Sequence, residues 1–238
     1  MIKLIDLLKE DDRILIPRRS PEERRKNHIA VIQKKIQQYI KNGSKGDFDL
    51  SGFPLETLPD NLKVGGDLNL FDAKITSLPN GLEVGGNLKL QNSLIKSLPD
   101  DLKVEGSIVL DNSKITSLPD NFKVKGNLTL NDSGIVSIPS GLKVGGNLEL
   151  VRTSIKSLPD NLKIGGNLRL RFVDIASLPK GLEVGGDLDL HYSDLESLPS
   201  DLKVGGFLDI RDTKISQKYS KEQIKQMIPG IRGIRFYV

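Results

Sequence analysis

Apolar residues recur in this chain with a period of 20 positions, and the pattern continues without insertion or deletion. Eight copies of the unit run from Asp47 to Gly206, and a ninth begins at Phe207 and stops near Ser216. Six positions of the unit are apolar in nearly every copy, represented by Phe48, Leu50, Leu62, Val64, Ile75 and Leu78. This period predicts a solenoid, because one coil cannot bury its own apolar side and stacked coils can.

Each unit contains a Leu-x-Leu segment, which is Leu88–Leu90 in the third copy. The alternation predicts a strand whose leucines point inward and whose middle residue points outward. Identical strands stacked about 4.8 Å apart form a parallel sheet and bring the six apolar columns into one core. We therefore expect a repeat β-solenoid built from 20-residue coils, which occupies residues 47–216.

Proline and glycine recur at fixed positions of the unit. A proline follows a leucine or isoleucine in every copy, Pro99 for example, and it excludes a regular strand there. The position of Gly106 is glycine in all eight copies, whereas the position before it varies and holds Glu105 and Lys125 in two of them. The invariant glycine is therefore expected to need a positive φ or to lack room for a Cβ.

Residues 1–46 are expected to form a basic helical cap. Ile2–Leu8 predicts a short amphipathic helix, and a brief apolar run follows at 14–16. Ser20 before Pro21 is typical of a helix start, and Gly43 is typical of a helix end. Apolar residues at helical spacing predict one stripe that covers the edge of the first coil, made of Ile29, Ile32, Ile36, Tyr39 and Ile40.

Residues 217–238 are expected to form a small α/β cap at the other end. Ser220 with Gln223 has the spacing of a capping box and predicts a short helix as far as Ile228. Pro229-Gly230 ends that helix, and the alternation in 231–238 predicts a last strand that closes the stack.

The unit Leu88-x-Leu90-x-x-Ser93-x-Ile95-x-x-Leu98-Pro99-x-x-Leu102 resembles the 20-residue leucine-rich repeat of bacterial proteins, over about two-thirds of the chain. The family's asparagine is replaced here by Ser, Thr, Ala or Val. The resemblance therefore implies a solenoid without the family's asparagine ladder and with a different curvature. The Val-Gly-Gly-Asn-Leu-x-Leu variant, with the segment Lys218–Ile224, also resembles uncharacterised repeat proteins of bacteriophages, which implies a phage origin.

The composition removes several classes of chemistry. The chain has no cysteine, which excludes disulfides, thiolate metal sites and the Cys-dependent ubiquitin ligase activity that some bacterial effectors with similar repeats carry. The glycine pairs recur along the repeat as structural turns and are not a phosphate-binding loop. We expect no cofactor, no membrane span, no signal peptide and a cytoplasmic location, which is the host cytoplasm or the virion if a phage encodes the chain.

Histidine and aspartate offer two weak alternatives. His191 lies near Ser193 and Asp194, but neighbours on one strand do not form a triad, so we expect an isolated surface histidine. Asp187, Asp189 and Asp209 could form a calcium cluster. However, stacking would place Glu149, Arg169 and Asp189 side by side as alternating charges, which need no metal. No metal site is therefore predicted.

The outward positions of the later coils differ from those of the earlier ones. Most early coils carry Asn, Asp or Gln where the later coils carry aromatic residues and arginine. Stacking should bring these residues together as a partner-binding site, since aromatic and arginine side chains dominate binding hot spots. The alternative is packing between coils that only stiffens the stack. The candidate residues are Phe172, Tyr192, Arg152, Arg169, Arg171 and His191.

Charge is divided unevenly along the chain, and this suggests a second surface. Residues 1–46 hold 12 Lys and Arg against 6 Asp and Glu, whereas residues 47–210 hold 16 against 23. The basic cap could bind nucleic acid, although a solvated helix face explains the same residues. The residues concerned are Arg18, Arg19, Arg24, Arg25 and Lys26.

Together these patterns predict a non-enzymatic scaffold that binds another macromolecule, with a protein as the expected partner. The alternatives are a phage structural or assembly component and a nucleic-acid-binding protein that acts through the basic cap. An enzyme is the class that the residues support least, because no catalytic constellation is present.

Overall fold

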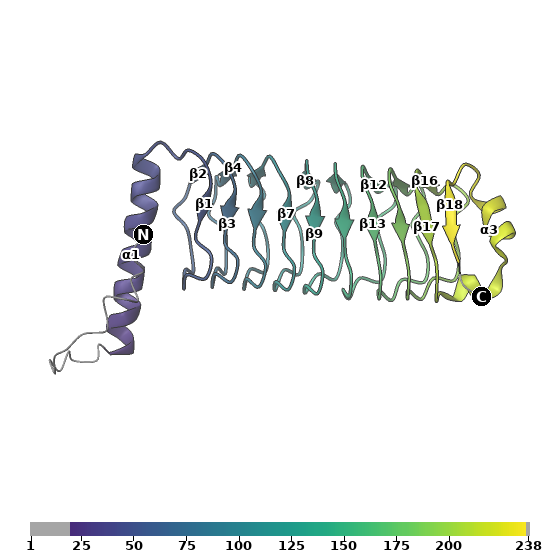
Figure 1. Cartoon of the computed structure of the whole chain (residues 1–238), viewed down its shortest axis with the longest axis horizontal. Helices are drawn as coiled ribbons and strands as arrows, with labels where there is room; N and C mark the ends of the chain where they lie inside the picture. Colours follow the sequence, from purple (N-terminus) through teal and green to yellow (C-terminus); the bar gives the residue numbers. More distant parts are fainter. Residues whose placement is uncertain (1–19, 237–238) are drawn as a thin grey trace, which may run out of the picture.

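The chain forms coils of 20 residues that stack along one nearly straight axis (Figure 1). The structure is a computed structural model and describes residues 20–236, so the helix predicted at Ile2–Leu8 lies outside the described residues. Each coil contributes one short strand to a 10-stranded parallel sheet. Its strands, in spatial order, are β1 (Phe48–Asp49), β3 (Leu68–Asn69), β5 (Leu88–Lys89), β7 (Ile108–Val109), β9 (Leu128–Thr129), β11 (Leu148–Glu149), β13 (Leu168–Arg169), β15 (Leu188–Asp189), β17 (Phe207–Asp209) and β18 (Gly233–Arg235).

A second line of parallel strands forms on the return side of the coils. The sequence did not predict these strands. The line is divided into a three-stranded and a five-stranded sheet. The first holds β2 (Lys63–Val64), β4 (Glu83–Val84) and β6 (Lys103–Val104); the second holds β8 (Lys123–Val124), β10 (Lys143–Val144), β12 (Lys163–Ile164), β14 (Glu183–Val184) and β16 (Lys203–Val204). In both lines, residue i pairs with residue i+20, as Leu148 does with Leu168. The 20-residue period is therefore the register of the sheets.

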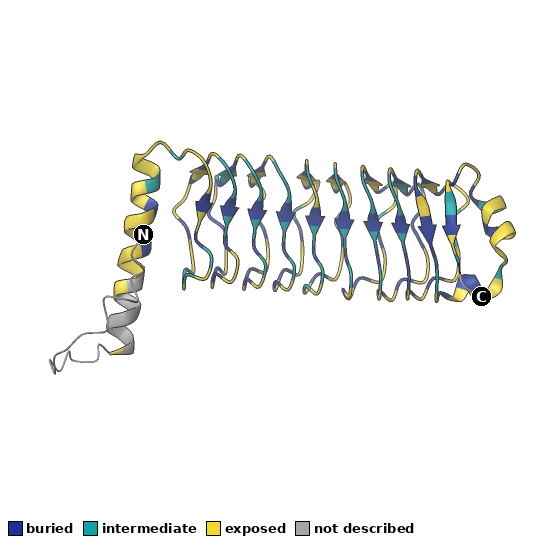
Figure 2. Cartoon of the chain, viewed as in Figure 1, coloured by how far each residue is buried: buried dark blue, intermediate teal, exposed yellow. Residues whose placement is uncertain are grey.

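The core is one continuous cluster of mostly aliphatic side chains inside the stack. Figure 2 shows that buried residues recur in the strands along the whole stack. Members of all six predicted apolar columns are buried, from Phe48 and Leu50 to Leu208 and Ile210. Two members are only partly buried, Leu55 in the first coil and Leu198 near the last. The prediction of a single core is confirmed, because each coil covers the apolar side of the next.

A ladder of polar side chains runs along the stack at a position other than that of the family's asparagine, and the sequence did not predict it. The ladder lies at the residue before each strand of the 10-stranded sheet. The backbone N–H of Asn87 donates to Oδ1 of Asp67 at 2.7 Å, and that of Asn147 donates to Oδ1 of Asn127 at 2.8 Å. It continues as far as Phe207, whose N–H donates to Asp187 at 2.8 Å. Each side chain satisfies a backbone donor of the next coil, which the pattern of a single coil does not reveal.

The invariant glycine lacks room for a side chain. A Cβ on Gly106 would lie 2.5 Å from Oδ1 of Asn87 in the ladder and 2.7 Å from the carbonyl oxygen of Gly86. The φ of Gly106 is not positive. Of the two reasons proposed from the sequence, close approach of neighbouring coils is therefore the correct one.

Helix α1 (Pro21–Lys41) lies across the first coil (Figure 1). It starts after Ser20 and ends before Gly43, whose φ is 79°, as predicted. Its Ile32 and Ile36 are buried, and the ring of Tyr39 stacks on Phe48 with centroids 4.1 Å apart. The predicted stripe is too wide, because Ile29 and Ile40 stay exposed.

The last coil is followed by helices α2 (Lys214–Lys218) and α3 (Lys221–Met227). The predicted capping box between Ser220 and Gln223 is present, and β18 pairs with β17 in parallel as the last strand. Helix α2, which Thr213 caps, was not predicted. Between residues 20 and 236, none of the helices is long and apolar enough to cross a membrane.

Candidate binding site

After each strand of the 10-stranded sheet the chain makes a tight turn, and the second turn residue has a positive φ in all nine coils. Six coils place Gly, Asn or Asp there, which adopt this conformation readily. The other three coils place Arg152 (φ 54°), Phe172 (φ 56°) and Tyr192 (φ 57°) at the same position. A positive φ is unfavourable for such residues, by about 1 kcal/mol or more. Three successive coils therefore depart from the residue types that suit the turn.

Phe172 and Tyr192 project from two adjacent coils and stack on each other. Their ring centroids are 4.9 Å apart and the ring planes differ by 15°. The exposed fractions of the two residues are 45 % and 50 %, which is high for side chains of this size. The guanidinium of Arg171 lies 5.9 Å from the centre of the Phe172 ring. The sequence prediction that these rings stack is confirmed, and they form an apolar step on a polar edge.

His191 lies beneath this step, and the expectation of an isolated surface histidine is wrong. Its exposed fraction is 8 %. Its ring stacks on Tyr192 at 4.0 Å, Nδ1 lies 3.3 Å from Nη2 of Arg171, and Nε2 lies 2.8 Å from Oδ2 of Asp212. A guanidinium can only donate, so Nδ1 accepts and Nε2 carries the hydrogen that Asp212 accepts. The histidine therefore supports the ring of Tyr192 from below.

The arginines of the predicted site are engaged by carboxylates of neighbouring coils. Arg152 contacts both oxygens of Asp132, with Nε–Oδ1 at 2.6 Å and Nη2–Oδ2 at 2.7 Å. Arg169 pairs with Glu149 across β13 and β11, as the register predicted. Arg152 and Phe172 occupy the same turn position of adjacent coils, so the ion pair of Arg152 lies next to the aromatic step. Two parallel N–H···O contacts favour one orientation of the Arg152 guanidinium.

The carboxylates beneath the site have opposite pKa shifts. Burial raises the pKa of Asp189, which lies between Arg171 and Asp209. Burial also acts to raise the pKa of Asp209, but hydrogen bonds from Arg211 outweigh it and the pKa lies below its usual value. Arg211 binds Asp209 at 2.8 Å and 2.6 Å. Among the described residues, no group of three or more His, Asp or Glu side chains is arranged to hold a metal ion.

Two features of the site were not predicted from the sequence. Asp132 and Asp212, which hold Arg152 and His191, were not singled out. The positive φ of the turn was also not predicted, although the recurrence of Gly, Asn and Asp at that position is the signal that could have shown it.

The basic residues of the cap are not brought into this site. Arg24, Arg25 and Lys26 belong to α1, at the opposite end of the stack from Phe172 and Tyr192 (Figure 1). Arg18 and Arg19 lie outside the described residues.

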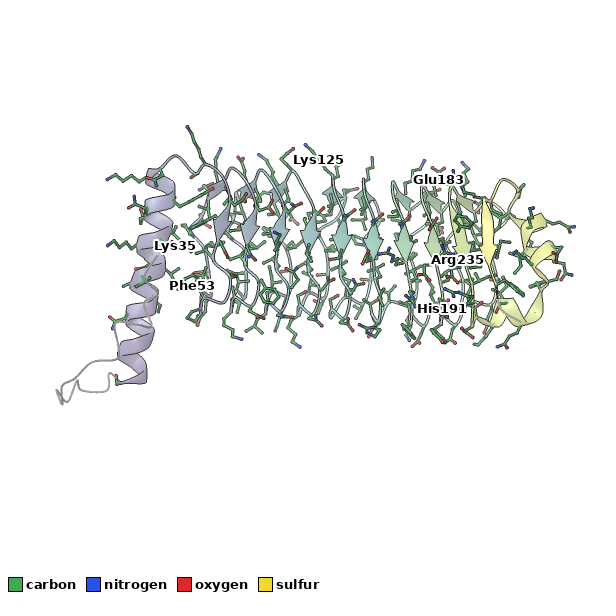
Figure 3. The ribbon with its side chains drawn as sticks, in the orientation of Figure 1. Lys35, Phe53, Lys125, Glu183, His191 and Arg235 are labelled. Atoms are coloured by element: carbon green, nitrogen blue, oxygen red, sulfur yellow. The ribbon has the colours of Figure 1, made fainter. Side chains whose placement is uncertain are left out.

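The opposite edge of the stack carries two shallow grooves along the second line of strands. Their volumes are about 980 Å³ and 800 Å³, and the residues Glu105 and Lys125 lie where one sheet ends and the next begins. Figure 3 shows Lys125 on this edge, whereas His191 lies near the other. Glu83 lies between Lys63 and Lys103 at 3.1 Å and 3.0 Å. Glu183 lies in the same way between Lys163 and Lys203. These ion pairs are exposed and contribute little to stability.

No family model and no curated protein matches the sequence. Among solved structures, the leucine-rich repeat domain of a Shigella effector is similar, with a TM-score of 0.53 and 20% identity over 92% of this chain and 91% of that one. The fold is leucine-rich-repeat-like. YopM from Yersinia enterocolitica has a TM-score of 0.40 and 19% identity over 77% of this chain and 50% of its own. A leucine-rich repeat protein of Leptospira interrogans has a TM-score of 0.33 and 17% identity over 85% and 81%. At these identities the likeness concerns the fold alone.

Proposed function

We propose that this chain is a non-enzymatic scaffold that binds a protein through the turn edge formed by Arg152, Phe172 and Tyr192. The observation that supports it is the run of three residues with a positive φ whose types do not suit the turn. In this proposal residues 47–216 carry the binding surface, and residues 1–46 and 217–238 cover the ends of the stack.

The energetics of the turn favour binding over mere stiffening. Asn or Asp would relieve the strain at each position, and stacking of two half-exposed rings returns only about 0.5–1.5 kcal/mol. The stacking energy thus roughly offsets the strain at the two positions. The stability of the fold therefore gives no reason for aromatic residues there. Strained residues that persist without a gain in stability are typical of binding sites.

The chemistry of the edge indicates what kind of protein surface fits it. The aromatic step offers a flat apolar contact, and the ordered guanidinium of Arg152 beside it offers donors to a carboxylate or a carbonyl oxygen. Aromatic anchors with adjacent arginine are the residues that supply most of the energy of protein interfaces. The expected partner presents an apolar side chain with an acidic neighbour.

The test is an affinity capture from source-cell lysate with the wild-type chain and the double variant Phe172→Asn, Tyr192→Asn. Asparagine suits the turn, so the fold is retained while the aromatic step is removed. Phe71→Asn is the matched control, because Phe71 is an exposed aromatic residue on an earlier coil. We expect a protein that the wild type and Phe71→Asn capture and the double variant loses. Equal capture by all three chains would contradict the proposal.

Two further measurements separate the alternatives taken from the sequence. A partner that disappears on nuclease treatment, and on loss of residues 1–46, would move the function to the basic residues of the cap, with affinity that falls steeply with salt. If the chain is a phage structural or assembly component instead, light scattering will show that it assembles as its concentration rises.

A further inference from the structure

Four arginines lie on the coils of the aromatic step and on the two coils beside them, and three of the four have a carboxylate of this chain at hydrogen-bond distance. Arg152 holds its carboxylate through contacts of 2.6 Å and 2.7 Å, and Arg211 does so through contacts of 2.8 Å and 2.6 Å. Arg169 is paired as well. For Arg171, Nε lies 3.8 Å from Oδ2 of Asp189, which is too far for a hydrogen bond.

The guanidinium of Arg171 has donors that no described residue satisfies. Its Nε is buried and makes no hydrogen bond. Nη2 lies 3.3 Å from Nδ1 of His191, which is a neutral acceptor because Nε2 of that ring carries the hydrogen. Nη1 has no acceptor within residues 20–236 and is not buried, so it reaches solvent. The positive charge of Arg171 is therefore the one at this edge that lacks a bound carboxylate.

The fold does not require an arginine at this position. The equivalent residue is Phe71, Gln91 or Val151 in other coils. Those coils form the same strand and the same turn with a positive φ at its second residue. A buried donor without an acceptor costs free energy, so the stability of the stack gives no reason for Arg171.

Arg171 is nevertheless oriented by its neighbours. His191 accepts from Nη2, and Asp212 holds the tautomer of that histidine through Nε2 at 2.8 Å. The guanidinium carbon lies 5.9 Å from the centre of the Phe172 ring, within the range of a cation–π contact. An arginine that is ordered before binding loses less conformational entropy when a ligand arrives.

We propose that Arg171 binds a carboxylate of the partner, beside the apolar side chain that covers the aromatic step. This inference rests on the proposed function, and it assigns the partner's acidic group to Arg171 because Asp132 already neutralises Arg152. The hydrogens of Nη1 and Nη2 that His191 leaves free can bind both oxygens of one carboxylate.

The spacing of the two contacts indicates the form of the partner segment. In an extended segment, alternate side chains lie on one face about 6.7 Å apart. This is close to the 5.9 Å between the guanidinium carbon of Arg171 and the centre of the Phe172 ring. The segment that fits therefore carries an apolar residue and an acidic residue two positions apart.

The test uses two tripeptides with blocked ends, Leu-Gly-Asp and Leu-Gly-Asn, which differ only in a carboxylate against an amide. NMR titration of the full chain follows the Nε–H signal of Arg171 and the ring signals of Tyr192. The variant Arg171→Gln assigns the arginine signal, and Gln91 at the equivalent position shows that glutamine suits the fold. Arg235→Gln is the matched control, because it removes the same charge from the last strand of the same sheet.

We expect the acidic peptide to bind the wild type and Arg235→Gln about tenfold more tightly than the amide peptide, which corresponds to about 1.4 kcal/mol. Arg171→Gln should bind the two peptides equally. A preference for the acid that survives in Arg171→Gln and disappears in Arg152→Gln would overturn the inference and move the carboxylate to Arg152. The absence of any shift with the acidic peptide would overturn it as well.

Failure of this inference can be told apart from failure of the proposed function. Equal binding of both peptides, with the Tyr192 ring shifting in each titration, would overturn the role of Arg171 and leave the aromatic step as a binding site. In the lysate capture, a partner that Arg171→Gln retains and Phe172→Asn, Tyr192→Asn loses would have the same meaning. A partner that the double variant also retains would contradict the proposed function itself.

Discussion

At the scale of single residues, the strained turn position makes a direct prediction. Asn112 occupies it with φ 56° in a coil whose neighbours there are Asn92 and Asp132, so a ring at 112 would find no ring to stack on. Asn112→Phe should destabilise the fold by about 1 kcal/mol, and Asn112→Asp should be close to neutral. Urea denaturation measures both. If Asn112→Phe has no cost, the turn tolerates bulky residues and the argument from Phe172 and Tyr192 fails.

The half-buried carboxylate of Asp189 predicts a pH dependence. Burial raises its pKa in the folded state above the unfolded value, so the folded state holds the proton more tightly. At neutral pH the ionised carboxylate therefore lowers the free energy of unfolding. This lowering disappears as the pH falls through the pKa of the folded state towards the pKa of the unfolded state. Asp189→Asn should stabilise the chain at pH 7 and have little effect near pH 4. Denaturation at both pH values checks the sign, and a variant less stable at pH 7 would contradict it.

At the scale of elements, the break between β6 and β8 is the irregular feature. Glu105 and Lys125 replace a glycine there, and at the equivalent Gly65 a Cβ would lie 2.8 Å from a carbonyl oxygen of the preceding segment. Glu105 still donates its backbone N–H to Val84 O at 2.9 Å and β4 stays paired with β6, so Glu105 alone does not interrupt the sheet. We attribute the break between β6 and β8 to the side chain of Lys125 against the segment of Glu105, whereas the polar ladder beside them continues through Ser107 and Asn127.

The double variant Glu105→Gly, Lys125→Gly should therefore join the two small sheets. Each backbone hydrogen bond that the variant restores contributes about 0.5–1.5 kcal/mol to stability. The exposed ion pair between Glu105 and Lys125, which the variant loses, contributes less than that. We expect a higher unfolding midpoint and slower amide exchange in Lys123–Val124. Unchanged exchange there would show that something other than the side chains separates the coils.

At the scale of the whole molecule, the stack is quasi-one-dimensional, since each coil pairs only with its neighbours. Deleting residues 87–106 removes one full period and joins Gly86 to Ser107, which preserves every column. The shortened chain should fold cooperatively with a lower midpoint, and X-ray scattering should show a rod shorter by about 4.8 Å. Deleting only 87–96 shifts all later columns out of register and should prevent folding. A folded half-period deletion would contradict the register argument.

The sequence by itself determined the repeat, the six buried columns, the register and the starts of helices α1 and α3. These features depend on local spacing. The direction of successive side chains and the hydrogen bonds of a helix cap are both set by residues a few positions apart. Only the tertiary structure decided the features that depend on neighbouring coils. Asp212 and Asp132, which pair with His191 and Arg152, lie 21 and 20 positions away along the chain, on neighbouring coils. The ladder from Asp67 onward also forms only between one coil and the next. The exposure of Ile29 likewise depends on how much of α1 the first coil covers. The spacing of residues along the chain does not show this.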